Sequence, residues 1–324
     1  MLKVFTAAIA AASLLAASAR AEDYPGTRPV SVMMPYAPGG PGDVITRITA
    51  AGINKVLGGQ FIVENLAGAG GTIGTAKVAA AAPDGHSLLV MHFGHAANMA
   101  LYPNLRYDAV KDFEPIGIIA ESPMAIVARK DFPAKDFKEF VAYVKAHKEK
   151  LTYGFAGVGS ASHLCALLFF NTIGASVTGV PYKGTGPALT DLMGGQFDFM
   201  CDQTLNVGQA AKAGTIKPYA VTTRERLAAF SDWPTAAEAG LPGFEITVWF
   251  AMWAPKGTPQ PVIAELSKAL QQAISDPETK ARFAGSGAQT VSPDRATPAA
   301  LRGFLQSELD RWVPIIKKAG VTAE

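Results

Sequence analysis

Short apolar runs alternate with amphipathic segments along most of this chain. In the first third, apolar runs predict strands over residues 30–34, 61–63, 88–91 and 115–119. Apolar positions at helical spacing predict helices over 43–57 and 72–81. This alternation of strand and helix is typical of α/β proteins with a mainly parallel sheet.

A second series of the same kind follows. Extended runs predict strands over 124–129, 152–155, 177–180, 197–201 and 216–221. Helical spacing predicts helices over 161–173, 187–193 and 205–212, preceded by one whose apolar face carries Phe137, Phe140, Val141 and Val144. The rest predicts a short helix and turn at 235–243, a long β-like run at 244–253, and helices over 259–275, 277–283 and 298–318.

Two such series predict two lobes, with the chain crossing between them near 121–124 and again near 243–247. We assign 22–122 plus 244–324 to lobe 1 and 123–243 to lobe 2, and we expect the C-terminal helices to pack on lobe 1. Two crossing segments form a hinge, so the cleft between the lobes can close on a ligand.

The stretch 35–43, Pro-Tyr-Ala-Pro-Gly-Gly-Pro-Gly-Asp, separates the first predicted strand from the first helix. Its prolines interrupt regular structure, and its glycines let the backbone approach a ligand closely. Asp43 suits the start of the helix, where a carboxylate can accept a backbone N–H. Since a helix N-terminus attracts anions, this stretch is either an anion-binding loop or simply a tight turn.

Similar loops of small residues follow three other predicted strands, at 67–72, 92–95 and 157–163. Open α/β sheets bind their ligands at the carboxyl ends of their strands. The repetition therefore favours the ligand-binding interpretation.

The composition describes a soluble globular protein, with 49% hydrophobic and 17% charged residues among 324. A net charge of +2 gives no reason to expect nucleic acid as a partner. The sequence lacks a Walker A motif, a complete Gly-x-Gly-x-x-Gly fingerprint, a Gly-x-Ser-x-Gly elbow and a His-Glu-x-x-His helix. This pattern favours a binding protein, with neither cofactor nor metal, over a hydrolase or dehydrogenase.

Residues 1–21 have the features of a signal peptide. Lys3 is followed by an apolar segment over 4–17 and by Ala19-Arg20-Ala21, which predicts cleavage after Ala21 and export to the periplasm. In that oxidising compartment the two cysteines, Cys165 and Cys201, are expected to pair. A helix carrying Cys165 would pack across the sheet that carries Cys201, so the two side chains can meet; the alternative is two buried free thiols.

Short motifs occur along the chain in a fixed order: Pro35-Tyr36-Ala37-Pro38-Gly39-Gly40 with Asp43 and Arg47, Asn65-x-x-Gly68-Ala69-Gly70-Gly71, Pro83-Asp84-Gly85, Gly159-Ser160-Ala161-Ser162-His163-Leu164, Val180-Pro181-Tyr182-Lys183-Gly184, Met193-Gly194-Gly195-Gln196, Cys201-Asp202-Gln203 and Trp253-Ala254-Pro255-Lys256-Gly257-Thr258-Pro259. In this order they resemble the periplasmic substrate-binding proteins of tripartite tricarboxylate transporters, the Bug or TctC-like family. The resemblance covers essentially the whole chain after the predicted signal peptide.

The resemblance implies a type II periplasmic-binding-protein fold, with two Rossmann-like lobes joined by a two-segment hinge. It also implies a monomer that captures a small carboxylate and delivers it to a membrane permease. The implied ligand-binding residues are Tyr36, Ala37, Pro38, Gly39, Gly40, Asp43, Ala69 and Gly70 in lobe 1, and Gly159, Ser160, Ala161, Ser162, His163, Lys183 and Asp202 in lobe 2. Residues after the third strand, His92, Phe93 and His95, are candidates for ligand specificity.

Several of these residues have a simpler alternative role. Ser160 or Ser162 can cap the helix that follows, and Asp43 can shape its loop without contacting an anion. His163 can be a satisfied core histidine, and Lys183 a solvated charge. Phe93 either stacks on an aromatic acid or fills the core of its lobe.

Two functions remain open at this point. The first is a receptor for a small carboxylate, which could be a dicarboxylate, a citrate-like acid, an aromatic acid, an amino acid or a nicotinate-like compound. The second is a secreted enzyme of small metabolites that uses His163 and Asp202.

Overall fold

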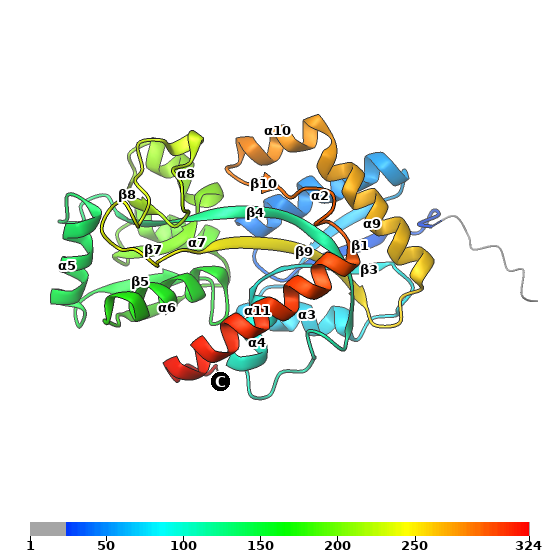
Figure 1. Cartoon of the computed structure of the whole chain (residues 1–324), viewed down its shortest axis with the longest axis horizontal. Helices are drawn as coiled ribbons and strands as arrows, with labels where there is room; N and C mark the ends of the chain where they lie inside the picture. The colour runs from blue at the N-terminus through cyan, green and yellow to red at the C-terminus, as the bar shows by residue number, and fades with distance from the viewer. Residues whose placement is uncertain (1–23, 324) are drawn as a thin grey trace, which may run out of the picture.

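A computed structural model describes residues 24–323 of the chain. The predicted signal peptide and its cleavage site lie outside the described residues. Two α/β halves lie side by side, joined by the long strand β4 (Phe113–Arg129) (Figure 1). Within residues 24–323, no helix is both long and apolar enough to cross a membrane.

The strands follow the order β2-β1-β3-β9-β4-β7-β5-β6, with β8 and β10 also paired to β4. In lobe 1 they are β1 (Val30–Met34), β2 (Phe61–Asn65), β3 (Ser87–His92), β9 (Thr247–Pro255) and β10 (Gln289–Thr290). In lobe 2 they are β5 (Thr152–Phe155), β6 (Thr178–Pro181), β7 (Phe199–Gln203) and β8 (Ile216–Val221). The pairs β1–β2, β1–β3, β5–β6 and β5–β7 are parallel, as the alternating pattern predicts.

Helices cover both sheets. Lobe 1 carries α2 (Pro41–Leu57), α3 (Thr72–Ala79), α4 (Gly94–Leu101), α9 (Gln260–Ser275), α10 (Pro277–Gly285) and α11 (Pro298–Ala319), with the short 3-10 helix η1 (Ala69–Gly71). Lobe 2 carries α5 (Phe137–His147), α6 (Ala161–Ile173), α7 (Thr185–Met193) and α8 (Thr204–Lys212), with η2 (Ala228–Phe230). Helices α9 and α10 pack on α2, and α11 packs on α4 and β4, so the C-terminal helices return to lobe 1 as expected.

The two strands predicted at 115–119 and 124–129 are one continuous strand, β4. It pairs with β9 as far as Pro123 and with β7 and β8 from Met124 onward. Pro123 lies where the partner changes, a position that tolerates a residue without an N–H. The predicted break is therefore a change of partner within one strand.

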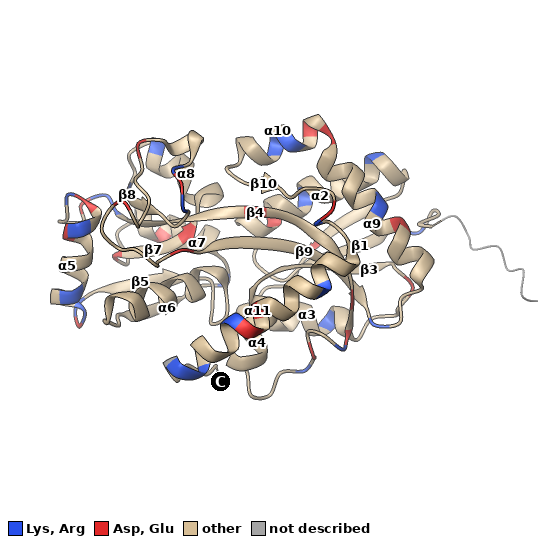
Figure 2. Cartoon of the chain, viewed as in Figure 1, with Lys and Arg blue, Asp and Glu red and all other residues tan. Residues whose placement is uncertain are grey.

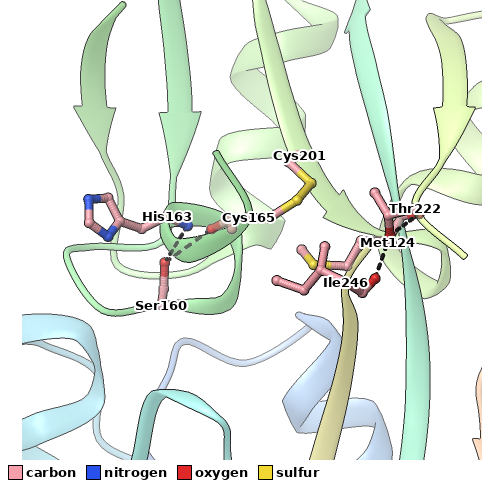
Figure 3. Close-up of a disulfide and its surroundings, with 8 residues drawn as sticks. Met124, Ser160, His163, Cys165, Cys201, Thr222 and Ile246 are labelled. Carbon is pink, nitrogen blue, oxygen red and sulfur yellow. Dashed lines mark hydrogen bonds between the residues drawn. A yellow bond between two sulfur atoms is a disulfide. The ribbon is translucent and has the colours of Figure 1, made fainter. Parts of the chain in front are cut away.

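Thr222 forms hydrogen bonds to both segments of the hinge. Its N–H donates to the carbonyl of Met124 (2.9 Å), and its hydroxyl donates to the carbonyl of Ile246 (2.5 Å), just before β9 (Figure 3). Thr222 therefore joins the two segments that cross between the lobes. The bounds given above for the two lobes stay a prediction.

One smaller expectation was wrong, and one helix had not been expected. Residues 235–243 form turns and a single bridge to Val221, without the predicted helix. Helix α4 was not predicted, because it begins at Gly94 and no side chain caps its first turn.

The disulfide between Cys165 and Cys201 is present, as expected from the export signal. It links α6 to β7 with the two Cα atoms 6.0 Å apart (Figure 3). The strand that carries Asp202 is therefore covalently tied to the helix that carries Ser160, Ser162 and His163 at its start.

Candidate functional site

A cavity lies between the lobes, where β1, β3, β5 and β7 end. Lobe 1 contributes Met34, Tyr36, Ala37, Gly40, Pro41, Gly42, Asp43, His92 and Phe250 to its lining, and lobe 2 contributes Ala156, Ser160, Ala161, Ser162, Gly184, Thr185, Asp202 and Gln203. Its empty volume, including the open mouth, is about 370 Å³. The lobes thus leave space for a small molecule only.

Four helices begin at this cavity. The lining contains the start of α2 at Gly40, of α6 at Ser160, of α7 at Gly184 and of α8 at Gln203. The first N–H groups of a helix have no partner within the helix, and they carry a partial positive charge. Four such ends around one small space favour an anion.

The positive potential comes from the backbone alone. As far as the described residues show, no lysine or arginine lines the cavity. Figure 2 shows the lysines and arginines mostly on outer helices and loops, while the long strands β4 and β9 are almost entirely tan. The arrangement suits an anion that is held by directed N–H groups.

Asp43 shapes the loop at the start of α2. Its carboxylate accepts hydrogen bonds from the Gly39 N–H (3.0 Å), Arg47 Nε (2.9 Å) and Asn65 Nδ2 (3.1 Å). Burial alone would raise the pKa of Asp43, but these bonds outweigh it and hold the pKa below its usual value. Asp43 is therefore ionised but already paired, and the Gly39 N–H is taken up by it.

His92 connects three loops of lobe 1. Its Nδ1 accepts the Gly94 N–H (2.9 Å), so the neutral ring carries its proton on Nε2, which donates to the Tyr36 hydroxyl (3.0 Å). The Tyr36 hydroxyl in turn donates to the Gly70 carbonyl (2.7 Å). Burial lowers the pKa of His92 to about 3, so this relay stays neutral at physiological pH.

The first turn of α6 is fixed by its serines. Ser160 caps the helix by accepting the His163 N–H (3.2 Å) (Figure 3). Ser162 accepts the Ala156 N–H (2.9 Å). His163 accepts the Gly159 N–H at Nδ1 (3.2 Å), and burial lowers its pKa to about 4. His163 is a neutral, largely buried residue beside the cavity lining.

Asp202 is the last residue but one of β7 and is fully buried. One carboxylate oxygen, Oδ2, accepts from Asn206 Nδ2 (2.6 Å). Burial raises the pKa of Asp202 to about 7, although the bond from Asn206 opposes this. The carboxyl group lines the cavity without a lysine or arginine partner among the described residues.

The lobes touch around the cavity. The Ala37 N–H donates to the Lys183 carbonyl (3.3 Å), and the Tyr102 hydroxyl donates to the Val158 carbonyl (2.7 Å). A Cβ added at Gly70 would lie 1.8 Å from the Val158 carbonyl oxygen, so only glycine fits there. The structure is thus a closed form in which loops of the two lobes interlock.

Residues 45–321 match the family described as the tripartite tricarboxylate transporter family receptor, TctC. The chain belongs to this family. The resemblance drawn from the loop motifs is therefore confirmed, and with it the two-lobed periplasmic-binding-protein fold.

Relatives of this receptor support the same assignment. A UPF0065 protein of Agrobacterium vitis is 46% identical over 98% of this chain and 91% of its own length. The solved structure of the periplasmic binding protein BugD is 44% identical, with a TM-score of 0.89 over 93% of this chain and all of that one. MatC from Rhodopseudomonas palustris, solved with bound malate, is 42% identical, with a TM-score of 0.87 over 90% of this chain and 99% of that one.

Half of the predicted site residues meet at the cavity of this family member. They are Tyr36, Ala37, Gly40, Asp43, His92, Ser160, Ala161, Ser162 and Asp202. Ala69, Gly70 and Lys183 line a neighbouring hollow between the lobes instead. Pro38, Gly39, Gly159 and His163 lie close by in the same loops, outside the lining.

The two remaining candidates lie in the core of lobe 1. Phe93 is buried and stacks on Trp312, with 5.2 Å between ring centroids. His95 is buried among Tyr107, Phe113 and Trp253, and its Nε2 donates to the Ala109 carbonyl (3.2 Å). For Phe93, filling the core of its lobe is the alternative that the structure supports.

Several lining residues were not predicted. They are Met34, Pro41, Gly42, Ala156, Gly184, Thr185, Gln203 and Phe250. Gly184, Thr185 and Gln203 lie at the starts of α7 and α8, each of which follows a strand of lobe 2. The same helix-start signal that marked residues 40–43 could have identified them.

Proposed function

We propose that this protein is a periplasmic receptor that captures a small carboxylate between its lobes and delivers it to the permease of a tripartite tricarboxylate transporter. The observation that carries the proposal is the meeting of four helix N-termini, from both lobes, at one cavity with no lysine or arginine in its described lining. Closure of the lobes completes this site, because α2 comes from lobe 1 and α6, α7 and α8 from lobe 2.

The relatives point to the same class of ligand. MatC, which shares 42% of its residues with this chain, is solved with malate. Malate carries two carboxylates, and each suits a cluster of free N–H groups. We take the periplasm, the monomeric state and the predicted permease as parts of the same proposal.

The structure gives less support to the enzyme that uses His163 and Asp202. Asp202 lines the cavity, whereas His163 does not. The Nδ1 of His163 is also occupied by the Gly159 N–H. A general base and its partner need a shared space with the substrate, which these two side chains lack here.

The first test is a thermal-shift screen of the purified mature protein against small carboxylates, each paired with its amide. A true ligand at 100 times its Kd adds about 2.7 kcal/mol of stability, which gives a clear rise in Tm. Stabilisation by one class of acid, with the acid recovered unchanged after long incubation, supports the receptor. No shift with any acid, or steady product formation, overturns it.

A further inference from the structure

Two oxygen atoms in the wall of the cavity are buried without a partner. They are Asp202 Oδ1 and Gln203 Oε1, at the end of β7. Among the described residues, neither atom takes part in a hydrogen bond, although both side chains line the cavity. The Thr185 side chain and the Gln203 backbone act on Asp202 only enough to oppose the rise of its pKa. Asp202 is 0% exposed and Gln203 is 4% exposed, so bulk water does not reach them in this closed form.

Of the two side chains, Asp202 has the chemically less ambiguous unpaired oxygen. Once Asp202 has lost its proton, its free oxygen can only accept a hydrogen bond, whereas the protonated carboxyl group could also donate one. The Gln203 amide presents either an oxygen or an NH₂ group, depending on its orientation. Leaving a buried acceptor unpaired is unfavourable, and native proteins rarely do so. The free oxygen therefore indicates that something in the cavity donates to it when the site is filled.

The Asp202 side chain is held in place from several sides. Asn206 Nδ2 donates to Oδ2 (2.6 Å) and also to the Thr185 carbonyl (3.2 Å), so its amide is fixed by two acceptors. Asp202 pairs with Ala125 in the sheet, and the preceding Cys201 is tied to α6 by the disulfide. Oδ1 therefore cannot turn to another partner without moving β7 or Asn206.

The cavity thus has two kinds of wall. The starts of α2, α6 and α7 offer N–H donors, which suit a carboxylate. Asp202 offers an acceptor, which would repel a second carboxylate at that point but suits a hydroxyl or an ammonium group. A ligand that satisfies both walls carries a donor close to its carboxylate.

We propose that Asp202 Oδ1, beside the Gln203 amide, accepts a hydrogen bond from a hydroxyl or ammonium substituent of the bound acid, so that the receptor selects 2-hydroxy or 2-amino carboxylates over unsubstituted ones. The inference rests on the proposed function, since it concerns the same cavity. It adds the residue that determines specificity and the group that this residue recognises.

The test uses matched sets of acids in calorimetric titrations of the full mature protein. One set is succinate, malate and aspartate, and a longer set is glutarate, 2-hydroxyglutarate and glutamate. Within each set the acids differ only at the second carbon, which bears hydrogen, a hydroxyl or an ammonium. In the set that fits, we expect a substituted acid to bind about 10-fold to 100-fold more tightly than the unsubstituted one. A stronger gain for the hydroxy or for the amino acid identifies the donor.

Two variants assign the preference to Asp202. Asp202→Leu removes the acceptor at similar size, and we expect the substituted acid to lose its advantage over the unsubstituted one. Asp202→Asn preserves the shape and the bond to Asn206, and it should abolish the extra gain of an ammonium ligand. Asp232→Leu, at an exposed position of the same lobe, is the control and should leave the preference unchanged.

The outcomes separate this inference from the proposed function. Equal affinity across each set in the wild-type protein, or a preference that survives in both Asp202 variants, overturns the role of Asp202 and leaves the carboxylate receptor intact. Failure of every acid to bind overturns both.

Discussion

The two sides of the cavity differ in how their polar side chains are satisfied. On the lobe 1 side, Asp43, His92 and the Tyr36 hydroxyl find their partners within the protein. On the lobe 2 side, Asp202 and Gln203 each keep one oxygen unpaired. We infer that lobe 1 is preorganised for the carboxylate common to all ligands, while lobe 2 recognises the substituent that differs between ligands.

Removing the disulfide should loosen the lobe 2 side alone. The bridge spans a sequence separation of 36, for which the chain-entropy relation gives about 4 kcal/mol. We expect Cys165→Ser with Cys201→Ser to lose about that much free energy of unfolding in urea titrations. If the variant and the disulfide-bonded wild-type protein unfold at the same urea concentration, the bridge does not stabilise the wall that carries Asp202.

Preventing closure should weaken ligand binding whichever side of the cavity contacts the ligand, because neither side then completes the site. Gly70→Ala places a Cβ 1.8 Å from the Val158 carbonyl oxygen across the cleft, and we expect at least about 100-fold weaker binding by calorimetry. Gly58→Ala is the matched control, since Gly58 has a similar positive φ and nothing within 4 Å of an added Cβ. X-ray scattering should show that only the Gly70 variant fails to contract with ligand; equal behaviour of the two variants contradicts the closed site.

Breaking the relay on the lobe 1 side should cost less. His92→Phe leaves the buried Gly94 N–H without its acceptor and the Tyr36 hydroxyl without its donor, so we expect a loss of about 1–3 kcal/mol in stability. Tyr36→Phe should act through the same bonds. A double-mutant cycle measures this coupling, and fully additive losses would show that the two residues do not work as one relay.

The smallest effect is a pH dependence on the lobe 2 side. The pKa of Asp202 in the folded protein, about 7, lies above the ordinary value of 3.8 for an aspartate, so the folded state keeps the proton to higher pH. The stability from Asp202 is complete below about pH 4 and is lost as the pH rises through about 7. Relative to Asp202→Asn, the ligand-free wild-type protein should lose about 1 kcal/mol between pH 6 and pH 8. A difference that does not change with pH contradicts this assignment.

Most helices and strands could be predicted because the chain alternates apolar runs with helical segments that are bounded by glycine and proline. The exceptions depend on tertiary context. Pro123 looks like a strand end until one sees that β4 changes partners there, and α4 starts at a glycine without a capping side chain. Neither feature has a local signal in the sequence.

The residues of the site also divide into those with a local signal in the sequence and those that depend on tertiary context. The loop at 35–43 was predictable because prolines and glycines before a helix are a strong local pattern. His92 faces the cavity while the adjacent Phe93 stacks on Trp312 in the core, and the sequence alone does not tell these directions apart. The orphaned oxygen of Asp202 depends on what surrounds it, so it could only be found in three dimensions.

The central claim is that the carboxylate itself is what the cavity between the lobes binds. The most direct measurement is a calorimetric titration with the tightest-binding acid and with each of its amides, which keep the shape but lose the charge. Hydrogen bonds to a charged group contribute about 1.5–3 kcal/mol each, so at least one amide should bind about 10-fold to 100-fold more weakly than the acid. Equal affinity for the acid and all of its amides would contradict the account.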